Sequence, residues 1–259
     1  MNKKVKKILN KKNKSKIICL TAYSKNIASI LDKHCDLVLV GDSLGSVLYN
    51  YKSTQEVTLD IMIRHSKSVR LGVNESLMVV DMPYNTYRNP NEALKNAKLI
   101  MKKTKCDAIK LEGGKKIISI VKNLVKNKIP VMGHLGILPQ TEKKFTFKGK
   151  KLAERNRILK EAQLLEKAGI FSVVLECIET KLSKKITEQL KIPTIGIGSS
   201  VNCDGQVLVI DDLIGLSEVK FRFVKKYANT RQIIDNAVKR YKSEVLKKKF
   251  PKAKHSFKN

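Results

Sequence analysis

The chain has 259 residues, which is enough for one sizeable core and close to the length of many single α/β barrels. A formal net charge of +30 raises the question of nucleic acid or an anionic membrane, but no basic segment is interleaved with aromatic residues and Trp is absent. No apolar stretch approaches the roughly 18 residues that cross a bilayer, and no secretory signal is evident. We therefore expect a protein that binds neither a membrane nor a specific nucleic acid.

Lysine is concentrated at the two ends of the chain. Eight lysines fall within the first sixteen residues, and a second group lies between Lys239 and Lys258. We expect three parts: residues 1–16 as a basic tail or a helix packed on the domain, 17–250 as a catalytic domain, and 251–259 as a C-terminal tail. The five cysteines form no CxxC pair, and several lie in or beside apolar runs, which indicates buried free thiols and a reducing, cytoplasmic location.

Short apolar runs alternate along the chain with segments of helical spacing. The runs predict eight strands, at residues 17–21, 37–41, 77–81, 107–111, 129–133, 171–176, 192–197 and 206–210. The spacing predicts helices at 24–33, 57–71, 91–103, 115–127, 151–168, 181–190 and 230–249. This alternation is typical of βαβ units around a parallel sheet, and eight strands are the number of a closed TIM barrel. We expect an α/β fold of the (β/α)8 type in a single domain.

Polar residues stand where the predicted strands end. They are Asp42, Ser43, Asp81, Lys110, Glu112, His134 and Glu176. A single acid in such a place is commonly a helix cap or a turn residue. The same arrangement at five strand ends favours one site at the face of a barrel where the strands finish. A doubly wound open sheet is the alternative, but it would place its ligand at fewer strand ends.

The carboxylates of this set suit a divalent cation together with a proton transfer. Asp42, Asp81, Glu112 and Glu176 offer the hard oxygen ligands that Mg²⁺ prefers, with one carboxylate left over as a base. A cation that polarises a 2-oxo acid, a lysine that neutralises its charge and a glutamate that removes the adjacent C–H proton would together support enolate chemistry.

Three of these side chains have alternative interpretations. Lys110 and Glu112 are two residues apart on one predicted strand, so both point to the same side, either into the site or into a structural salt bridge with each other. His134 could polarise a carbonyl or bind a carboxylate, or it could be a core histidine whose hydrogen bonds are satisfied.

Ordered motifs run along nearly the whole chain. They are LTAY at Leu20, VGDSLG at Val40, VTLD at Val57, DMPYNTY at Asp81, KLEGG at Lys110, GHLGILPQ at Gly133, VLECI at Val174, IPTIGIG at Ile192 and CDGQVLV at Cys203. In this order and spacing the chain resembles the ketopantoate hydroxymethyltransferase family.

The resemblance implies a Mg²⁺-dependent TIM-barrel enzyme. Its reaction would transfer a one-carbon unit from 5,10-methylenetetrahydrofolate to 3-methyl-2-oxobutanoate, giving 2-dehydropantoate for pantothenate and coenzyme A synthesis. By the same resemblance Asp42 and Asp81 would bind the metal, with Glu112 contributing directly or through water, and Ser43 and Lys110 would hold the oxo acid. Homo-oligomers, often decamers, are also implied.

The remaining roles and the departures from the family pattern concern other positions. Glu176 matches the proton acceptor of the family, and His134 would line the pocket. Ser24, Ile61 and the pair Ser199–Ser200 replace residues usual in the family. These departures bear on folate-side contacts and on a loop rather than on the metal and proton-transfer groups.

Two other functions are compatible with parts of the sequence. A Mg²⁺-dependent oxo-acid lyase or mutase of the phosphoenolpyruvate/pyruvate barrel type would share the enolate chemistry, but the cysteine-containing KKCGH motif of the lyases is absent. A basic polyanion-binding module is the non-enzymatic alternative, suggested by the net charge of +30.

Overall fold

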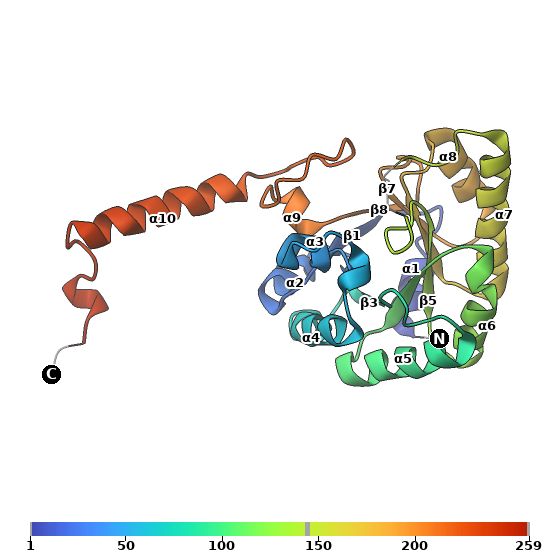
Figure 1. Cartoon of the computed structure of the whole chain (residues 1–259), viewed down its shortest axis with the longest axis horizontal. Coiled ribbons are helices and arrows are strands. Elements are labelled where there is room, and N and C mark those ends of the chain that lie inside the picture. The colour runs from blue at the N-terminus through green and yellow to red at the C-terminus, as the bar shows by residue number, and fades with distance from the viewer. Residues whose placement is uncertain (1, 143–145, 258–259) are drawn as a thin grey trace. The chain divides into compact units, whose positions relative to one another are not determined.

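Eight parallel strands close into a barrel in the computed structural model, which describes residues 2–142 and 146–257 (Figure 1). In chain order they are β1 (Ile17–Thr21), β2 (Leu37–Val40), β3 (Leu77–Asp81), β4 (Ala108–Glu112), β5 (Val131–Gly136), β6 (Ser172–Glu176), β7 (Thr194–Ile197) and β8 (Gly205–Leu208). Each strand pairs in parallel with the next, and β8 pairs with β1. The TIM-type barrel expected from the sequence is confirmed. Met1 and residues 258–259, which the sequence assigns to the two tails, lie outside the described residues.

Helices surround the strands. They are α2 (Lys25–Leu31), α3 (Leu44–Tyr49), α4 (Leu59–Arg70), α5 (Pro90–Thr104), α6 (Ile118–Lys126), α7 (Leu152–Ala168) and α8 (Thr180–Gln189), with short 3-10 helices at Thr54–Glu56 and Lys115–Ile117. Their ends follow from local chemistry. The side chain of Asn89 caps α5 by accepting from the backbone of Glu92, and α7 stops at Gly169, whose φ of 99° suits glycine.

The strand boundaries show where sequence patterns define a strand and where they do not. The prediction for β3 coincides with the observed Leu77–Asp81, because five buried residues in a row leave no ambiguity. The prediction for β5, 129–133, was wrong at both ends, since the strand runs from Val131 to Gly136. Pro130 has no N–H for the ladder, and Gly133 and Gly136 lack the β-branched side chains that mark a strand.

Helix α1 (Lys3–Leu9) lies within the basic N-terminal segment and packs at one end of the barrel. Val5 and Ile8, each 1% exposed, join a core cluster with the strand residues Ile17, Leu37 and Leu77. These strand residues stand at the starts of β1, β2 and β3. Helix α1 therefore covers the amino-terminal end of the barrel, which leaves the opposite end for a site.

Contacts divide the chain into two compact units, Met1–Val209 and Ile210–Asn259. The barrel belongs to the first unit. The second contains α9 (Ile210–Leu213), α10 (Thr230–Leu246) and a 3-10 helix at Ala253–His255, and no residue of α10 is buried. The three-part division expected from the sequence stays a prediction. None of the described helices has the length and apolar character needed to cross a membrane.

Candidate functional site

The ionisable residues singled out in the sequence gather at the carboxyl-terminal end of neighbouring strands. Asp81 is the last residue of β3 and Glu176 the last of β6, while β4 carries Lys110 and Glu112. The pairing register places Asp81 beside Lys110, and Glu112 beside His134 on β5. Such a register brings their side chains together at one mouth of the barrel, where active sites of this fold are found.

These acids are not helix caps. The N-cap of α3 is Ser43, that of α5 is Asn89 and that of α8 is Glu179. The alternative interpretation of the strand-end acids as caps is therefore wrong for this chain.

Lys110 carries the positive charge of the cluster. Its Nζ lies 2.9 Å from Oδ1 of Asp81, and both side chains are almost completely buried. This ion pair joins β4 to β3. The alternative interpretation, a salt bridge between Lys110 and Glu112 on the same strand, is therefore wrong. Burial lowers the pKa of Lys110, but the carboxylates of Asp81, Glu112 and Asp42 raise it above its usual value. Lys110 is therefore a fixed cation.

Asp42 sits on the loop after β2 against Asp81. Its backbone N–H donates to Oδ2 of Asp81 at 3.1 Å. Gly41, directly before Asp42, leaves room for the hydroxyl of Ser43, since a Cβ at that position would lie 2.9 Å from its Oγ. Burial and the neighbouring Asp81 raise the pKa of Asp42 to about 7, and burial together with Asp42 raises that of Glu112 well above its usual value. The cluster thus holds more carboxylates than Lys110 alone can neutralise.

His134 connects the acidic cluster with Glu176. Its Nε2 lies 3.1 Å from Oε2 of Glu176, while its Nδ1 lies 3.4 Å from Nζ of Lys110 and 3.5 Å from Oε1 of Glu112. Burial, followed by the charge of Lys110, lowers the pKa of His134. A neutral imidazole with its proton on Nε2 suits these neighbours, because Nε2–H can donate to Glu176 while Nδ1 accepts from Lys110.

Ser43 and Glu176 stand at the two sides of this constellation. The Oγ of Ser43 is 2.8 Å from the hydroxyl of Tyr23 on the loop after β1. Directly after Glu176 the chain turns through Cys177, a non-glycine residue with φ of 49°. This left-handed turn ends β6 and is stabilised by a hydrogen bond from the Cys177 N–H to the carbonyl of Ile197.

Gln140 is a member of the cluster that sequence reasoning missed. Its Nε2 donates to Oδ2 of Asp42 at 2.7 Å and to the carbonyl of Met82 at 3.0 Å, and its backbone N–H donates to Oε2 of Glu112 at 3.1 Å. The hydroxyl of Tyr87 donates to its Oε1. The only signal in the sequence was its place at the end of the GHLGILPQ motif.

The loop that follows β7 contains the departures Ser199 and Ser200. Ser199 accepts a hydrogen bond from the N–H of Ile178 and donates to the carbonyl of Leu175 at 2.7 Å. Ser200 is not among the described residues with positive φ, so its side chain is accommodated without backbone strain. Ser199 thus connects the loop after β7 to the end of β6.

The cluster has the oxygen donors that a divalent cation needs, but its side chains are not arranged around a common point. Over residues 2–142 and 146–257, no group of three or more His, Cys, Asp or Glu side chains is arranged to hold a metal ion. Asp42, Asp81 and Glu112 nevertheless offer buried oxygen donors, and burial, followed by the neighbouring carboxylates, raises the pKa of Asp42 and of Glu112. Hard oxygen donors in excess of cations fit Mg²⁺.

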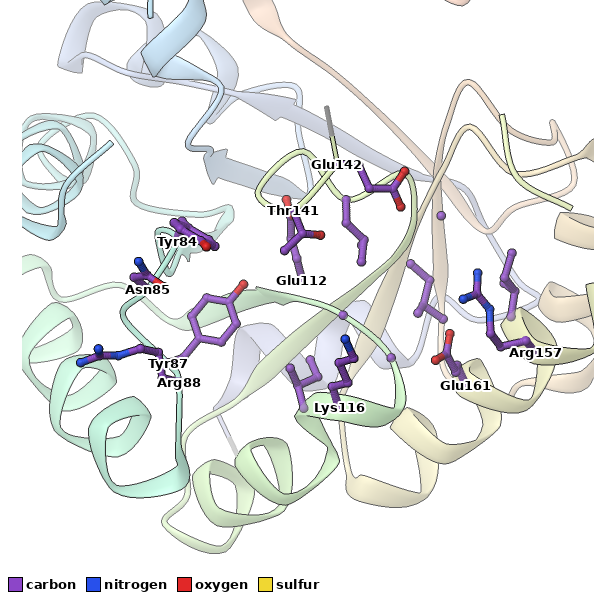
Figure 2. Close-up of a pocket in the computed structure, with 17 residues that line it drawn as sticks. Tyr84, Asn85, Tyr87, Arg88, Glu112, Lys116, Thr141, Glu142, Arg157 and Glu161 are labelled. Atoms are coloured by element: carbon purple, nitrogen blue, oxygen red, sulfur yellow. The ribbon is translucent and has the colours of Figure 1, made fainter. Parts of the chain in front are cut away.

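A cavity of about 360 Å³ opens beside Glu112 (Figure 2). Its walls come from the loop after β3, from the glycines after β4, from the segment after β5 and from α7. The lining residues include Tyr84, Tyr87, Lys116, Arg157 and Glu161. A volume in this range is typical of sites for small molecules.

A family model and full-length relatives agree on the family to which this chain is similar. The model of the ketopantoate hydroxymethyltransferase family matches residues 2–253. The 3-methyl-2-oxobutanoate hydroxymethyltransferase of Pelagibacter ubique is 67% identical over 257 residues, covering 99% of this chain and 100% of the relative, and that of Chelativorans sp. is 44% identical, covering 96% and 90%.

Solved structures show the fold at much lower identity. A phosphonopyruvate hydrolase complex with oxalate and Mg²⁺ matches with a TM-score of 0.63 at 9% identity, covering 97% of this chain and 93% of that one. A 2,3-dimethylmalate lyase of the phosphoenolpyruvate mutase/isocitrate lyase superfamily matches with a TM-score of 0.59 at 12% identity, covering 80% and 79%.

Proposed function

The chain belongs to the ketopantoate hydroxymethyltransferase family, and from that premise we propose how its buried cluster carries out the reaction. The activity is that of a 3-methyl-2-oxobutanoate hydroxymethyltransferase, which forms ketopantoate in pantothenate biosynthesis. Because the family is shown, the lyase, mutase and polyanion-binding functions are no longer considered. The one-carbon donor is 5,10-methylenetetrahydrofolate, as the enzyme's identity implies.

The oxo acid binds at the mouth of the barrel, against Lys110 and Ser43. Lys110 attracts the substrate carboxylate because its ammonium group is buried and permanently charged. Ser43 presents a hydroxyl whose orientation is fixed by Tyr23 at 2.8 Å. His134 forms part of the wall between these groups and Glu176.

Asp42 and Asp81 hold Mg²⁺, with Glu112 contributing directly or through a water molecule. When bound there, the ion would polarise the oxo acid and stabilise negative charge on its oxygens. The support is the surplus of buried carboxylates around Lys110: burial and then the charge of Asp81 raise the pKa of Asp42 to about 7, and a dication would offset both effects. The amide of Gln140, which donates to Asp42, is the group that a cation at Asp42 would have to displace.

Glu176 is the base in this proposal. It takes the proton from C3 of 3-methyl-2-oxobutanoate onto its carboxylate, and the electron pair of the broken C–H bond passes into the enolate. The enolate carbon bonds to the methylene carbon of the donor, and the oxygen of one water molecule becomes its hydroxyl group. Both bonds from that carbon to the folate nitrogens break, and tetrahydrofolate leaves with two protons on those nitrogens, the one taken up by Glu176 and one from the water. The observation that carries this assignment is the 3.1 Å distance between Oε2 of Glu176 and Nε2 of His134, which orients the carboxylate at the mouth.

Proton exchange in D₂O isolates this step. Wild-type protein incubated with 3-methyl-2-oxobutanoate and Mg²⁺, without the folate, should lose the C3 proton signal in NMR. Glu176→Gln should slow that exchange by about two to four orders of magnitude, because only the base is altered. Glu188→Gln, a surface change on α8, is the matched control and should exchange like the wild type. Undiminished exchange in Glu176→Gln would refute the assignment.

We also infer that the enzyme is a cytoplasmic homo-oligomer, a decamer if it follows the resemblance. The free cysteines Cys19, Cys35, Cys106, Cys177 and Cys203 support a reducing compartment. The apolar side chains of α10, none of which is buried, support association of subunits.

A further inference from the structure

We propose that the cavity beside Glu112 binds the reduced-folate donor of the reaction. The inference rests on the proposed function and adds to it the place of the second substrate. The donor must bring its methylene carbon to the enolate, so its site has to open directly onto the catalytic cluster. The cavity does so, because Glu112 belongs both to its lining and to the buried acidic cluster.

One wall of the cavity is aromatic. Figure 2 shows Tyr84 and Tyr87 on one side of the cavity, opposite Arg157 and Glu161. Tyr87 is held in place because its hydroxyl donates to Gln140, and burial raises its pKa so that it stays protonated. Flat rings in fixed positions favour stacking with an aromatic ligand, and a folate has two such parts, the pterin and the aminobenzoyl ring.

The opposite wall carries the carboxylate of Glu161 on α7. The backbone N–H of Lys115 donates to its Oε1 at 3.2 Å. Gly114, the second glycine of the KLEGG motif, allows this approach, since a Cβ there would lie 2.2 Å from Cδ of Glu161. In the described part of the chain Glu161 has no cationic partner, so its second oxygen is available to the adjacent N–H donors of a pterin edge.

Cationic side chains stand at the rim. Lys116 makes no ion pair with any described residue, and Arg157 has only Glu154 at 3.8 Å with most of its side chain exposed. Arg88, also in the lining, is already paired with Glu92 at 2.7 Å. Lys116 and Arg157 are therefore the groups available to the carboxylates of a glutamate tail that extends from the cavity toward solvent.

The first test changes the proposed pterin contact. Glu161→Gln keeps the shape of the side chain but loses its charge, so KM for 5,10-methylenetetrahydrofolate should rise at least about tenfold. Donor-independent C3 proton exchange should proceed as in the wild type, because Glu161 does not contact the oxo-acid groups. Thermal unfolding reports whether the variant is folded, and Glu188→Gln is the charge-matched control on α8.

The second test separates the tail from the pterin. Lys116→Met should weaken binding of the glutamylated donor several-fold, and the loss should shrink at high salt. A 5,10-methylenetetrahydropteroate donor, which lacks glutamate, should be used equally well by Lys116→Met and the wild type. Lys126→Met, at the far end of α6, is the control lysine change and should alter neither donor.

The outcomes distinguish this inference from the function on which it rests. Wild-type protein without exchange or transfer would overturn the proposed chemistry itself. Wild-type protein that exchanges and transfers, with donor KM unmoved in Glu161→Gln, would overturn the cavity assignment alone. A rise in KM for 3-methyl-2-oxobutanoate instead of the donor would also overturn it, because the cavity would then belong to the oxo acid.

Discussion

Gln140 bonds two carboxylates of the cluster although it carries no charge. It donates to Asp42, and its backbone N–H donates to Glu112, so it separates two carboxylates whose pKa is raised. A buried amide with all its hydrogen bonds made can hold such groups in place without adding charge. Gln140 thus stabilises the metal-free cluster, and binding of a cation at Asp42 would replace that function.

Removal of this amide should therefore destabilise the metal-free protein. Gln140→Met has similar volume, but it deprives Asp42 Oδ2, the Met82 carbonyl and the Tyr87 hydroxyl of their partner, which should cost about 1–3 kcal/mol in free energy of unfolding. Mg²⁺ should restore part of the loss because it neutralises Asp42. Urea denaturation with and without Mg²⁺ measures both effects.

Gln163→Met is the matched control for this change. Gln163 bonds Gln189 at the surface at 3.0 Å, so its replacement should alter the free energy of unfolding by less than about 0.5 kcal/mol. Equal losses in the two variants would show that Gln140 has no special role in the cluster.

The contrast between charged and uncharged residues explains what the sequence could predict at this scale. Asp42, Asp81 and Glu112 were predictable because an acid directly after a buried strand conflicts with its surroundings. Gln140 and Glu161 were not, because a glutamine in a loop and a glutamate on an amphipathic helix conflict with nothing locally. The contacts that place them beside the cluster and the cavity are made between segments far apart in the chain, which no local sequence pattern encodes.

At the scale of elements, the segment after α1 is attached to the barrel by one buried ion pair. Nζ of Lys12 lies 2.8 Å from Oδ2 of Asp204, and both side chains are at most 8% exposed. Lys12 also donates to the carbonyl of Thr187, and Asp204 accepts from the N–H of Thr194 at 2.8 Å. The N-terminal segment is therefore bonded to the loop before β8 and to α8.

Loss of the cation from this pair should be costly. Lys12→Met leaves Asp204 as a buried charge without its partner, which should lower the free energy of unfolding by about 3–5 kcal/mol. Chemical denaturation is the measurement. Lys14→Met, an exposed lysine in the same segment, should be close to neutral; a loss as large as that of Lys12→Met would mean that general charge, and not the ion pair, matters.

The elements themselves were largely predictable, with exceptions that have a physical cause. Alternation of apolar runs and helical spacing identified all the barrel strands, because parallel strands are buried on both faces and read as continuous apolar runs. The extension of β5 through His134 to Gly136 was not predictable, since a histidine and two glycines do not form the apolar, β-branched pattern that marks a buried strand. The sequence did not decide between a tail and a packed helix for α1, because its two buried residues, Val5 and Ile8, stand among lysines and give little apolar periodicity.

At the scale of the whole molecule, the apolar face of α10 is a surface that the unit Ile210–Asn259 leaves uncovered. Ile234, Val238, Tyr241 and Val245 recur at helical spacing on one face, and each is at least 42% exposed. Burial of side chains of this size in an interface contributes about 1.5–3 kcal/mol each. A second copy of the chain would cover this face, in agreement with the homo-oligomer proposed above.

Charge placed on that face should dissociate the assembly. Val238→Asp puts a carboxylate at the centre of the apolar stripe, so the mass measured by light scattering after size exclusion should fall below that of the wild type. Asn236→Asp is the matched control, because it adds the same charge on the opposite side of α10, where Asn236 already accepts a hydrogen bond from Gln232 at 3.0 Å. A wild-type chain that elutes as a monomer, or a Val238→Asp variant of unchanged mass, would contradict the role of α10, whereas loss of mass in Val238→Asp alone would locate a subunit interface on this helix.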